Sequence, residues 1–233
     1  MGIQKNGLLG TFYNKTGAVV GRRYRGINVI TGLPRISNKE ATPAQKEQQF
    51  KIGALTEMLS YLAEEVNIGF KKYKKKGHPV SLAFSYNFSR AFIVLPRVEK
   101  ILEFNGDDVP VTVLDFQSYI LLDFPKMVIT RGDIFSPDCP SIEIAENGNF
   151  TCSWMTTPEC VYNWRTDLVT LVIWDDTQKK SIHFRCMANR ASLSFTEQLP
   201  QEFMGGKLHG YLFCSTADYR EVGESVYLPI QIG

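Results

Sequence analysis

The chain has 233 residues, 44% of them hydrophobic, which is enough to bury a substantial core in one large domain or two modest ones. Its net charge of +2 is the sum of a basic and an acidic part: residues 1–100 hold 17 Lys or Arg and 6 Asp or Glu, whereas the remainder holds 9 Lys or Arg and 18 Asp or Glu. A basic half attracts polyanions or acidic protein surfaces, and an acidic half repels nucleic acid. There is no run of about 18 apolar residues and no apolar signal segment, so we expect no membrane association and no secretion by a signal peptide.

Residues 8–31 predict short strands punctuated by turns. The sequence NKTG suits a tight turn, and the Val, Tyr and Ile residues after it favour extended structure, so a β-ribbon is expected. The basic stretch of this ribbon contains Arg22, Arg23, Tyr24 and Arg25. Arginines beside an aromatic can grip phosphates and stack on a base. Charges that protect an edge strand against aggregation give the same pattern, so both interpretations stand.

The glycines of the ribbon do not form a phosphate loop. Gly17, Gly21, Gly26 and Gly32 have neither the spacing of a Walker loop nor that of a Rossmann turn. The sequence also lacks a nucleophile elbow, a His-Glu-x-x-His motif, an EF-hand loop and a kinase motif. We therefore expect no enzyme, no catalytic residue and no cofactor.

A long helix is predicted to begin at Thr42, which can cap it, with Pro43 in the first turn and Gln45 closing a capping box. Glu47 and Lys51 are spaced to pair across one turn. The helix should run to about residue 73 or 76. Its apolar stripe at three-to-four spacing consists of Phe50, Ala54, Leu55, Met58, Leu59, Leu62 and Val66.

The segment KKYKKKGHP marks the end of that helix. Gly77 can act as the C-cap, and Pro79 forbids continuation. A solvated helix terminus, where lysines complement the helix dipole, explains this run without a ligand, and anion binding is the other interpretation. A second helix is expected over residues 80–93. The candidate anion or nucleic-acid contacts in this segment are Lys71, Lys72, Lys74, Lys75 and Lys76.

The chain is expected to divide into a basic β-ribbon and helical region over residues 1–98, a linker or seam over 99–125, and a β-sandwich over 126–233. The sandwich is predicted by seven or eight short strands with turn-rich joints between them. A tryptophan on an early strand and a tyrosine on a late one resemble the fibronectin type III arrangement within the immunoglobulin-like class. The expected strands are KMVIT, SIEIA, NFTCSWM, DLVTLVIW, SIHFRC, ASLSF, KLHGYLFCS and SVYLPIQI.

Alternation within these strands assigns some faces and leaves others open. Phe150, Cys152 and Trp154 share one face of their strand, whereas in LHGYLFCS either alternate set can face inward. The five cysteines are an odd number without a Cys-x-x-Cys pair, and the three histidines lie far apart, so no disulfide framework and no metal site are expected. The RGD triplet at residues 131–133 matches an integrin-type motif, but matches this short are frequent by chance.

Four segments carry a resemblance to a known family: residues 7–59, NIGFKKY, VSLAFSYNFSRAFI and LHGYLFCSTADYREVGESVYL. Together they resemble uncharacterised proteins of about this length from Bacteroidota and their mobile elements. The front part, with the pattern G-x-V-V-G, R-G, P, N and T-P-A-Q, is similar to the opening of small proteins encoded among bacteriophage structural genes. The resemblance implies a context, and it assigns no catalytic residues.

The predicted fold class is α+β, with an N-terminal β-ribbon and helices and a C-terminal immunoglobulin-like (fibronectin-III-like) β-sandwich. We expect a non-enzymatic structural or interaction protein that works through protein partners, self-association or a larger assembly. It would lie in a virion if phage-encoded, and otherwise in the cytoplasm. The alternative is a nucleic-acid-binding protein that uses the basic N-terminal half, an expectation that rests on charge.

Overall fold

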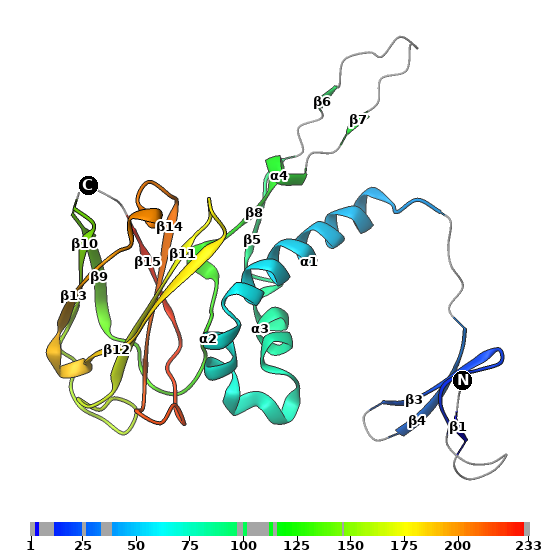
Figure 1. The fold of residues 1–233 in the computed structure, drawn as a ribbon, viewed down its shortest axis with the longest axis horizontal. Helices are drawn as coiled ribbons and strands as arrows, with labels where there is room; N and C mark the ends of the chain where they lie inside the picture. The colour runs from blue at the N-terminus through cyan, green and yellow to red at the C-terminus, as the bar shows by residue number, and fades with distance from the viewer. Residues whose placement is uncertain are drawn as a thin grey trace. The chain divides into compact units, whose positions relative to one another are not determined.

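The computed structural model describes residues 3–4, 12–24, 27–33, 39–96, 100–101, 112–113, 116–145 and 147–230. Contacts divide the chain into two compact units, Met1–Thr42 and Pro43–Gly233. The first unit is an antiparallel sheet in the strand order β1-β2-β3-β4, drawn in blue in Figure 1. Gly17, in the tight turn between β2 and β3, has a φ of +60°, a conformation that favours glycine. These strands are β1 (Ile3–Gln4), β2 (Phe12–Thr16), β3 (Val19–Tyr24) and β4 (Ile27–Gly32).

The second unit begins with helices. The predicted long helix starts at Pro43 as expected but is divided into α1 (Pro43–Tyr61), α2 (Ala63–Gly69) and a 3₁₀ helix, η2 (Lys71–Lys76). At the end of α2, Gly69 packs closely against Thr130, and a Cβ on this glycine would lie 2.4 Å from the Cα of Thr130. From the predicted stripe, Leu55, Met58, Leu59, Leu62 and Val66 are buried, while Phe50 and Ala54 are half-buried.

The expected helix over residues 80–93 is shorter in the structure. It forms α3 (Pro79–Asn87), and the chain then enters β5 (Phe92–Val94), which pairs with β8 (Ile120–Leu122). The cause is Asn87, whose buried amide donates to the carbonyl oxygens of Ala83 and Val128. The remaining short elements are β6 (Lys100–Ile101), β7 (Thr112–Val113), α4 (Phe116–Tyr119) and η3 (Phe124–Lys126).

The strand expected at residues 126–130 is absent from the described chain. After η3 this segment runs buried between the helices and the following strands without joining a sheet. Side chains satisfy its backbone instead: Val128 N–H donates to the Asn87 amide oxygen at 2.8 Å, and Ile129 N–H donates to the Ser225 hydroxyl at 2.9 Å. The apolar run therefore predicted burial correctly but not a strand.

Seven antiparallel strands form an immunoglobulin-like β-sandwich. One sheet has the order β13-β10-β9 and the other the order β12-β11-β14-β15. Most expected strands are confirmed, and NFTCSWM coincides with β10. The strands are β9 (Asp138–Ile144), β10 (Asn149–Met155), β11 (Leu168–Asp175), β12 (Lys180–Asn189), β13 (Ser194–Gln198), β14 (Leu208–Ser215) and β15 (Val226–Pro229); short 3₁₀ turns, η4 (Arg190–Ser192) and η5 (Gln201–Phe203), flank β13.

Helices cover the outer face of the four-stranded sheet, so the second unit has three layers (Figure 1). Leu212 and Cys214 of β14 point into the sandwich core, whereas Tyr211 and Phe213 point into a second core beneath α1, α2 and α3. Both alternate sets of this strand are therefore buried. The α+β class is confirmed.

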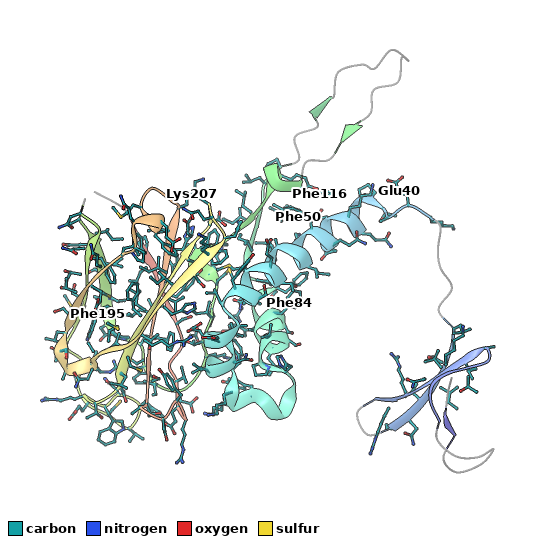
Figure 2. All side chains as sticks on the ribbon, in the orientation of Figure 1. Glu40, Phe50, Phe84, Phe116, Phe195 and Lys207 are labelled. Atoms are coloured by element: carbon teal, nitrogen blue, oxygen red, sulfur yellow. The ribbon has the colours of Figure 1, made fainter. Side chains whose placement is uncertain are left out.

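The boundary between the two compact units falls between Thr42 and Pro43, and not in residues 99–125, where the domain linker was expected. In this region Tyr119 and Ile120 are buried, and the Phe116 ring stacks on Phe50 of α1 with centroids 5.9 Å apart (Figure 2). The helices and the outer face of the four-stranded sheet share the second core, which explains why the helices and the sandwich form a single compact unit.

Candidate functional site

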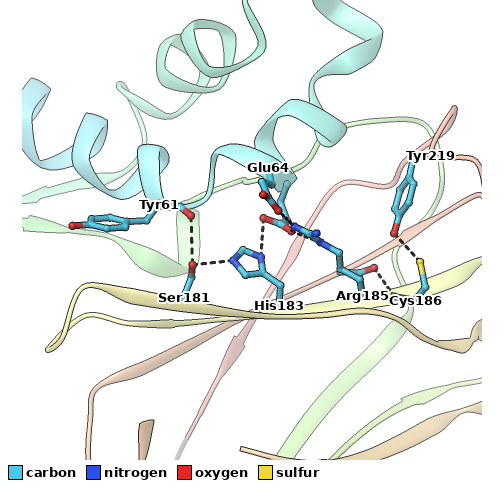
Figure 3. Close-up of polar contacts among 9 residues, drawn as sticks. Tyr61, Glu64, Ser181, His183, Arg185, Cys186 and Tyr219 are labelled. Carbon is cyan, nitrogen blue, oxygen red and sulfur yellow. Dashed lines mark hydrogen bonds and ion pairs between the residues drawn. The ribbon is translucent and has the colours of Figure 1, made fainter. Parts of the chain in front are cut away.

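A polar seam lies where α2 meets strand β12 (Figure 3). We use this name for Ser181, His183 and Arg185 of β12 together with Glu64 and Glu65 of α2. The three strand residues alternate with Ile182 and Phe184, which pack toward the sandwich core, so they share the face that meets the helices.

Glu65 is at the centre of the seam and is fully buried. It accepts hydrogen bonds from Nε and Nη2 of Arg185 at 2.9 and 2.6 Å, and its other oxygen lies 2.8 Å from Nδ1 of His183. That last contact is an ion pair by distance, but the ring N–H is poorly aligned for a hydrogen bond. The outer carboxylate, Glu64, also binds Arg185. One arginine therefore joins two adjacent glutamates.

The charges of the seam outweigh the cost of burying Glu65. Burial alone raises the pKa of this carboxyl, but its contacts with His183 and Arg185 lower the pKa more, so it ends below its ordinary value. The Arg185 guanidinium has a raised pKa in turn, chiefly because it binds Glu64. Glu65 is therefore a buried, ionised carboxylate at neutral pH.

The order carboxylate, imidazole, hydroxyl is also the order of a serine-hydrolase triad. Ser181 Oγ lies 2.9 Å from Nε2 of His183, which is within reach for proton transfer. The other neighbour of this hydroxyl is the carbonyl oxygen of Tyr61, 3.4 Å away at the end of α1 (Figure 3). An acceptor there competes for the hydroxyl proton and occupies space that a substrate carbonyl would need. The contacts of the seam thus account for the docking of α1 and α2 on the sheet.

The basic residues singled out from the sequence fall into two groups. Arg22 and Arg23 are exposed on β3, and as consecutive strand residues they point to opposite faces. Lys71 and Lys72 are exposed at the start of η2, where Lys72 forms an ion pair with Asp133. Arg25 and the side chains of Tyr24, Lys74, Lys75 and Lys76 lie outside the described part of the chain.

The RGD triplet is part of the fold. Asp133 is paired with Lys72, and a Cβ on Gly132 would lie 1.8 Å from the carbonyl oxygen of Val222. The Arg131 guanidinium lies over two tyrosine rings, Tyr73 and Tyr86. These contacts account for all three residues without a receptor.

Several large apolar side chains are exposed on the loop between β10 and β11, at the adjoining end of β10 and at Phe135. We call this group the loop surface. Phe135 and Tyr162 are 56% and 51% exposed, and their ring centroids lie 5.7 Å apart. The loop surface consists of Phe135, Met155, Val161, Tyr162 and Trp164, each more than half exposed.

The loop surface is braced from beneath. Cys160 and Asn163 exchange two backbone hydrogen bonds, and the backbone N–H of Trp164 donates to Asp167 at 2.9 Å. The buried Arg190 side chain donates to the carbonyl oxygen of Phe135, while its own carbonyl accepts from the Trp154 indole at 2.8 Å. The aromatic side chains are therefore attached to a backbone with few alternative conformations, which lowers the conformational entropy lost on binding.

Residues 10–95 and 103–229 match a family of unknown function, DUF6266. The chain belongs to this family. No curated protein matches the DUF6266 chain. Among solved structures, it is similar to the fn3 domain of human collagen alpha-1(XX), with 14% identity and a TM-score of 0.30 over 43% of this chain and 86% of that one. It is also similar to the chicken CNTN1 FN1–FN3 domains, with 8% identity and a TM-score of 0.26 over 52% of this chain and 36% of that one.

Two further properties concern the described residues of this DUF6266 chain. None of their helices is long and apolar enough to cross a bilayer. Their His, Cys, Asp and Glu side chains do not gather in threes in a way that could hold a metal ion. Sequence reasoning missed both the polar seam and the loop surface. The available signals were the charged Glu65 on an apolar helical stripe and the aromatic residues of the sequence VYNW, residues 161–164.

Proposed function

We propose that the protein is a non-enzymatic structural protein that self-associates through its loop surface as part of a larger assembly. The observation that carries this proposal is the group of five large apolar side chains, 51–74% exposed, on a braced loop. Apolar groups concentrated at one place on a surface mark protein–protein contacts. Tyrosine and tryptophan contribute large contact areas at low entropic cost.

Charge supports association between copies. Residues 1–42 hold seven Lys or Arg and one Asp or Glu. The remaining 191 residues hold nineteen Lys or Arg and twenty-three Asp or Glu, so the first unit is positively charged and the second is negatively charged. A copy with opposite net charges on its two units attracts other copies head to tail. The similarity of the N-terminal segment to phage structural proteins is the reason to propose a virion as the location of the assembly, and virion genes beside this gene would test that location.

Sedimentation velocity on the full chain tests self-association. We expect the wild-type protein to form larger species between about 10 and 200 µM, because interfaces of modest size commonly dissociate in the micromolar range. The variant Tyr162→Ser/Trp164→Ser should stay monomeric over this range. The matched control is Ile52→Ser, which removes an exposed apolar side chain from α1, away from the loop surface. A monomeric wild type throughout, or equal loss in the control, overturns the proposal.

Nucleic-acid binding is the second candidate function. The observation that favours it is the exposure of Arg22 and Arg23 on β3, within a segment of high positive charge. Binding would weaken with salt with a log–log slope of about −0.9 for each phosphate contacted on duplex DNA. A mobility-shift assay with the triple variant Arg22→Ala/Arg23→Ala/Arg25→Ala tests it. Binding absent at low salt, or unchanged in the variant, eliminates this candidate.

A further inference from the structure

A second feature, independent of the loop surface, is a pocket of about 240 Å³ beside the RGD turn. The end of α2, the start of η2 and the segment around Val222 form its walls. Its charged lining consists of four cations, Lys71, Lys72, Arg131 and Arg220, and two carboxylates, Asp133 and Glu221. The lining residues sum to +2, but Lys72 is paired with Asp133, and Arg220 is paired with Asp218 outside the lining.

Arg131 is held in place but is not neutralised. Its backbone N–H donates to the Gly69 carbonyl at 3.2 Å, and its guanidinium carbon lies 5.3 and 4.4 Å from the ring centroids of Tyr73 and Tyr86. Stacking on aromatic faces fixes the plane of the guanidinium and does not use its N–H groups. None of these N–H groups donates to an acceptor within the described residues. The donors are preorganised and available.

The positive charges around this pocket are crowded. Arg90 lies over the same Tyr86 ring as Arg131, with its guanidinium carbon 4.3 Å from the centroid. Lys71 has no acidic partner among the described residues, whereas Lys72 is neutralised by Asp133. Like charges brought together without a counter-ion disfavour the folded state, and a bound anion removes that cost.

We propose that this pocket binds a phosphate group, either free or as a monoester. Arg131 donates two parallel N–H bonds to the phosphate oxygens, and Lys71 contributes a second charge at the rim. A phosphate monoester carries a charge of about −1.5 to −2 at pH 7, which suits the two lining cations that have no acidic partner among the described residues, Arg131 and Lys71; a carboxylate, with a charge of −1, suits them less well. The site differs from a helix N-terminal phosphate loop because side chains supply its donors.

Isothermal titration calorimetry on the full chain tests the site, with inorganic phosphate, adenosine monophosphate and acetate as probes. We expect phosphate to bind at least about tenfold more tightly than acetate, because two charge-assisted bonds and a second cation act on it. A tighter Kd for adenosine monophosphate than for inorganic phosphate would identify a monoester as the ligand, and the reverse order would identify the free ion. The affinity for adenosine monophosphate should fall several-fold between pH 7.5 and pH 5.5, since the second pKa of a phosphate monoester is about 6.

Two variants make the test specific. Arg131→Met should weaken phosphate binding by about tenfold or more. Arg90 stacks on the same tyrosine ring but does not line the pocket, so Arg90→Met should change the affinity by less than about twofold. Lys71→Met changes an exposed side chain, so this variant keeps the fold even if Arg131→Met is unstable. Lys71→Met should also weaken phosphate binding. Undetectable phosphate binding at millimolar concentration, equal binding of acetate, or unchanged affinity in Lys71→Met overturns the proposal.

Discussion

Replacing Glu65 by glutamine measures how strongly the polar seam fastens the helices to the sheet. Removing the charge from one partner of a buried ion pair costs about 3–5 kcal/mol of unfolding free energy. Here the cost is smaller, because the Arg185 side chain is 38% exposed and keeps Glu64, and because glutamine keeps one acceptor oxygen. We expect a loss of about 2–3 kcal/mol, which lowers the melting temperature by about 5–10 °C for a folding unit of this size.

The neighbouring residue supplies the matched control. Glu64 binds the same Arg185, but its side chain is 74% exposed, and exposed ion pairs contribute about 0–1 kcal/mol. Urea unfolding at pH 7, followed by far-UV circular dichroism, should therefore show a large loss for Glu65→Gln and a small one for Glu64→Gln. Equal losses for the two variants, or a loss below about 0.5 kcal/mol for Glu65→Gln, would refute the argument that burial sets the energy of the seam.

Three further outcomes are expected. First, the Glu65 pKa is lower in the folded state than its ordinary value of 4.5. The stability that this carboxylate supplies is therefore complete above pH 4.5 and is lost as the pH falls through the folded pKa. Urea unfolding should show that the difference in unfolding free energy between wild type and Glu65→Gln shrinks in acid. Second, thermal melts should show that Gly132→Ala destabilises by about 2–3 kcal/mol, because its Cβ meets the Val222 carbonyl, whereas Gly53→Ala stabilises by about 0.5–1 kcal/mol, because its Cβ meets nothing within 4 Å on α1. Third, a thiol reagent at pH 8 should label two of the five cysteines quickly, and fast labelling of either buried thiol would contradict the structure. The fast pair is Cys139 and Cys160, while burial raises the pKa of Cys152 and Cys214 to about 12 and keeps them unreactive.

Local sequence signals predicted most of the elements correctly. Pro43 marks the start of α1, and Glu47 and Lys51 form the ion pair their spacing predicts, at 2.7 Å. Strand β10 was predicted with its inward face because Phe150, Cys152 and Trp154 alternate with polar residues. In each case the deciding interactions lie within one turn or one strand.

Errors arose where distant segments decide the structure. The predicted long helix is divided at Leu62, and Gly69, where α2 ends, packs closely against Thr130, sixty-one residues later. Residues 126–130 are not a strand because the side chains of Asn87 and Ser225 bind their backbone. The ambiguity in β14 came from burial on both faces, which periodicity cannot distinguish from a fully apolar segment.

The candidate sites were less predictable than the fold. The sequence predicted the strand that carries Ser181, His183 and Arg185, but no local signal connects them to their partner Glu65, which is more than a hundred residues away. The pocket beside the RGD turn is lined from separate segments, among them Lys71, Arg131 and Glu221. The sequence singled out the lysines of η2 as candidate anion contacts, but Arg131 only as part of the RGD triplet. The virion location and the role of the N-terminal arginines stay predictions.

The helical layer sets a limit on how the protein can be dissected. A fragment containing only residues 126–233 would expose one whole face of the β11–β14 sheet, including Val172, Trp174, Tyr211 and Phe213. A naked apolar sheet face of that kind aggregates, so a stand-alone sandwich is not a viable expression product. The compact unit that contains the sandwich starts at Pro43, so any deletion series or domain transplant should keep the helices together with the strands they cover.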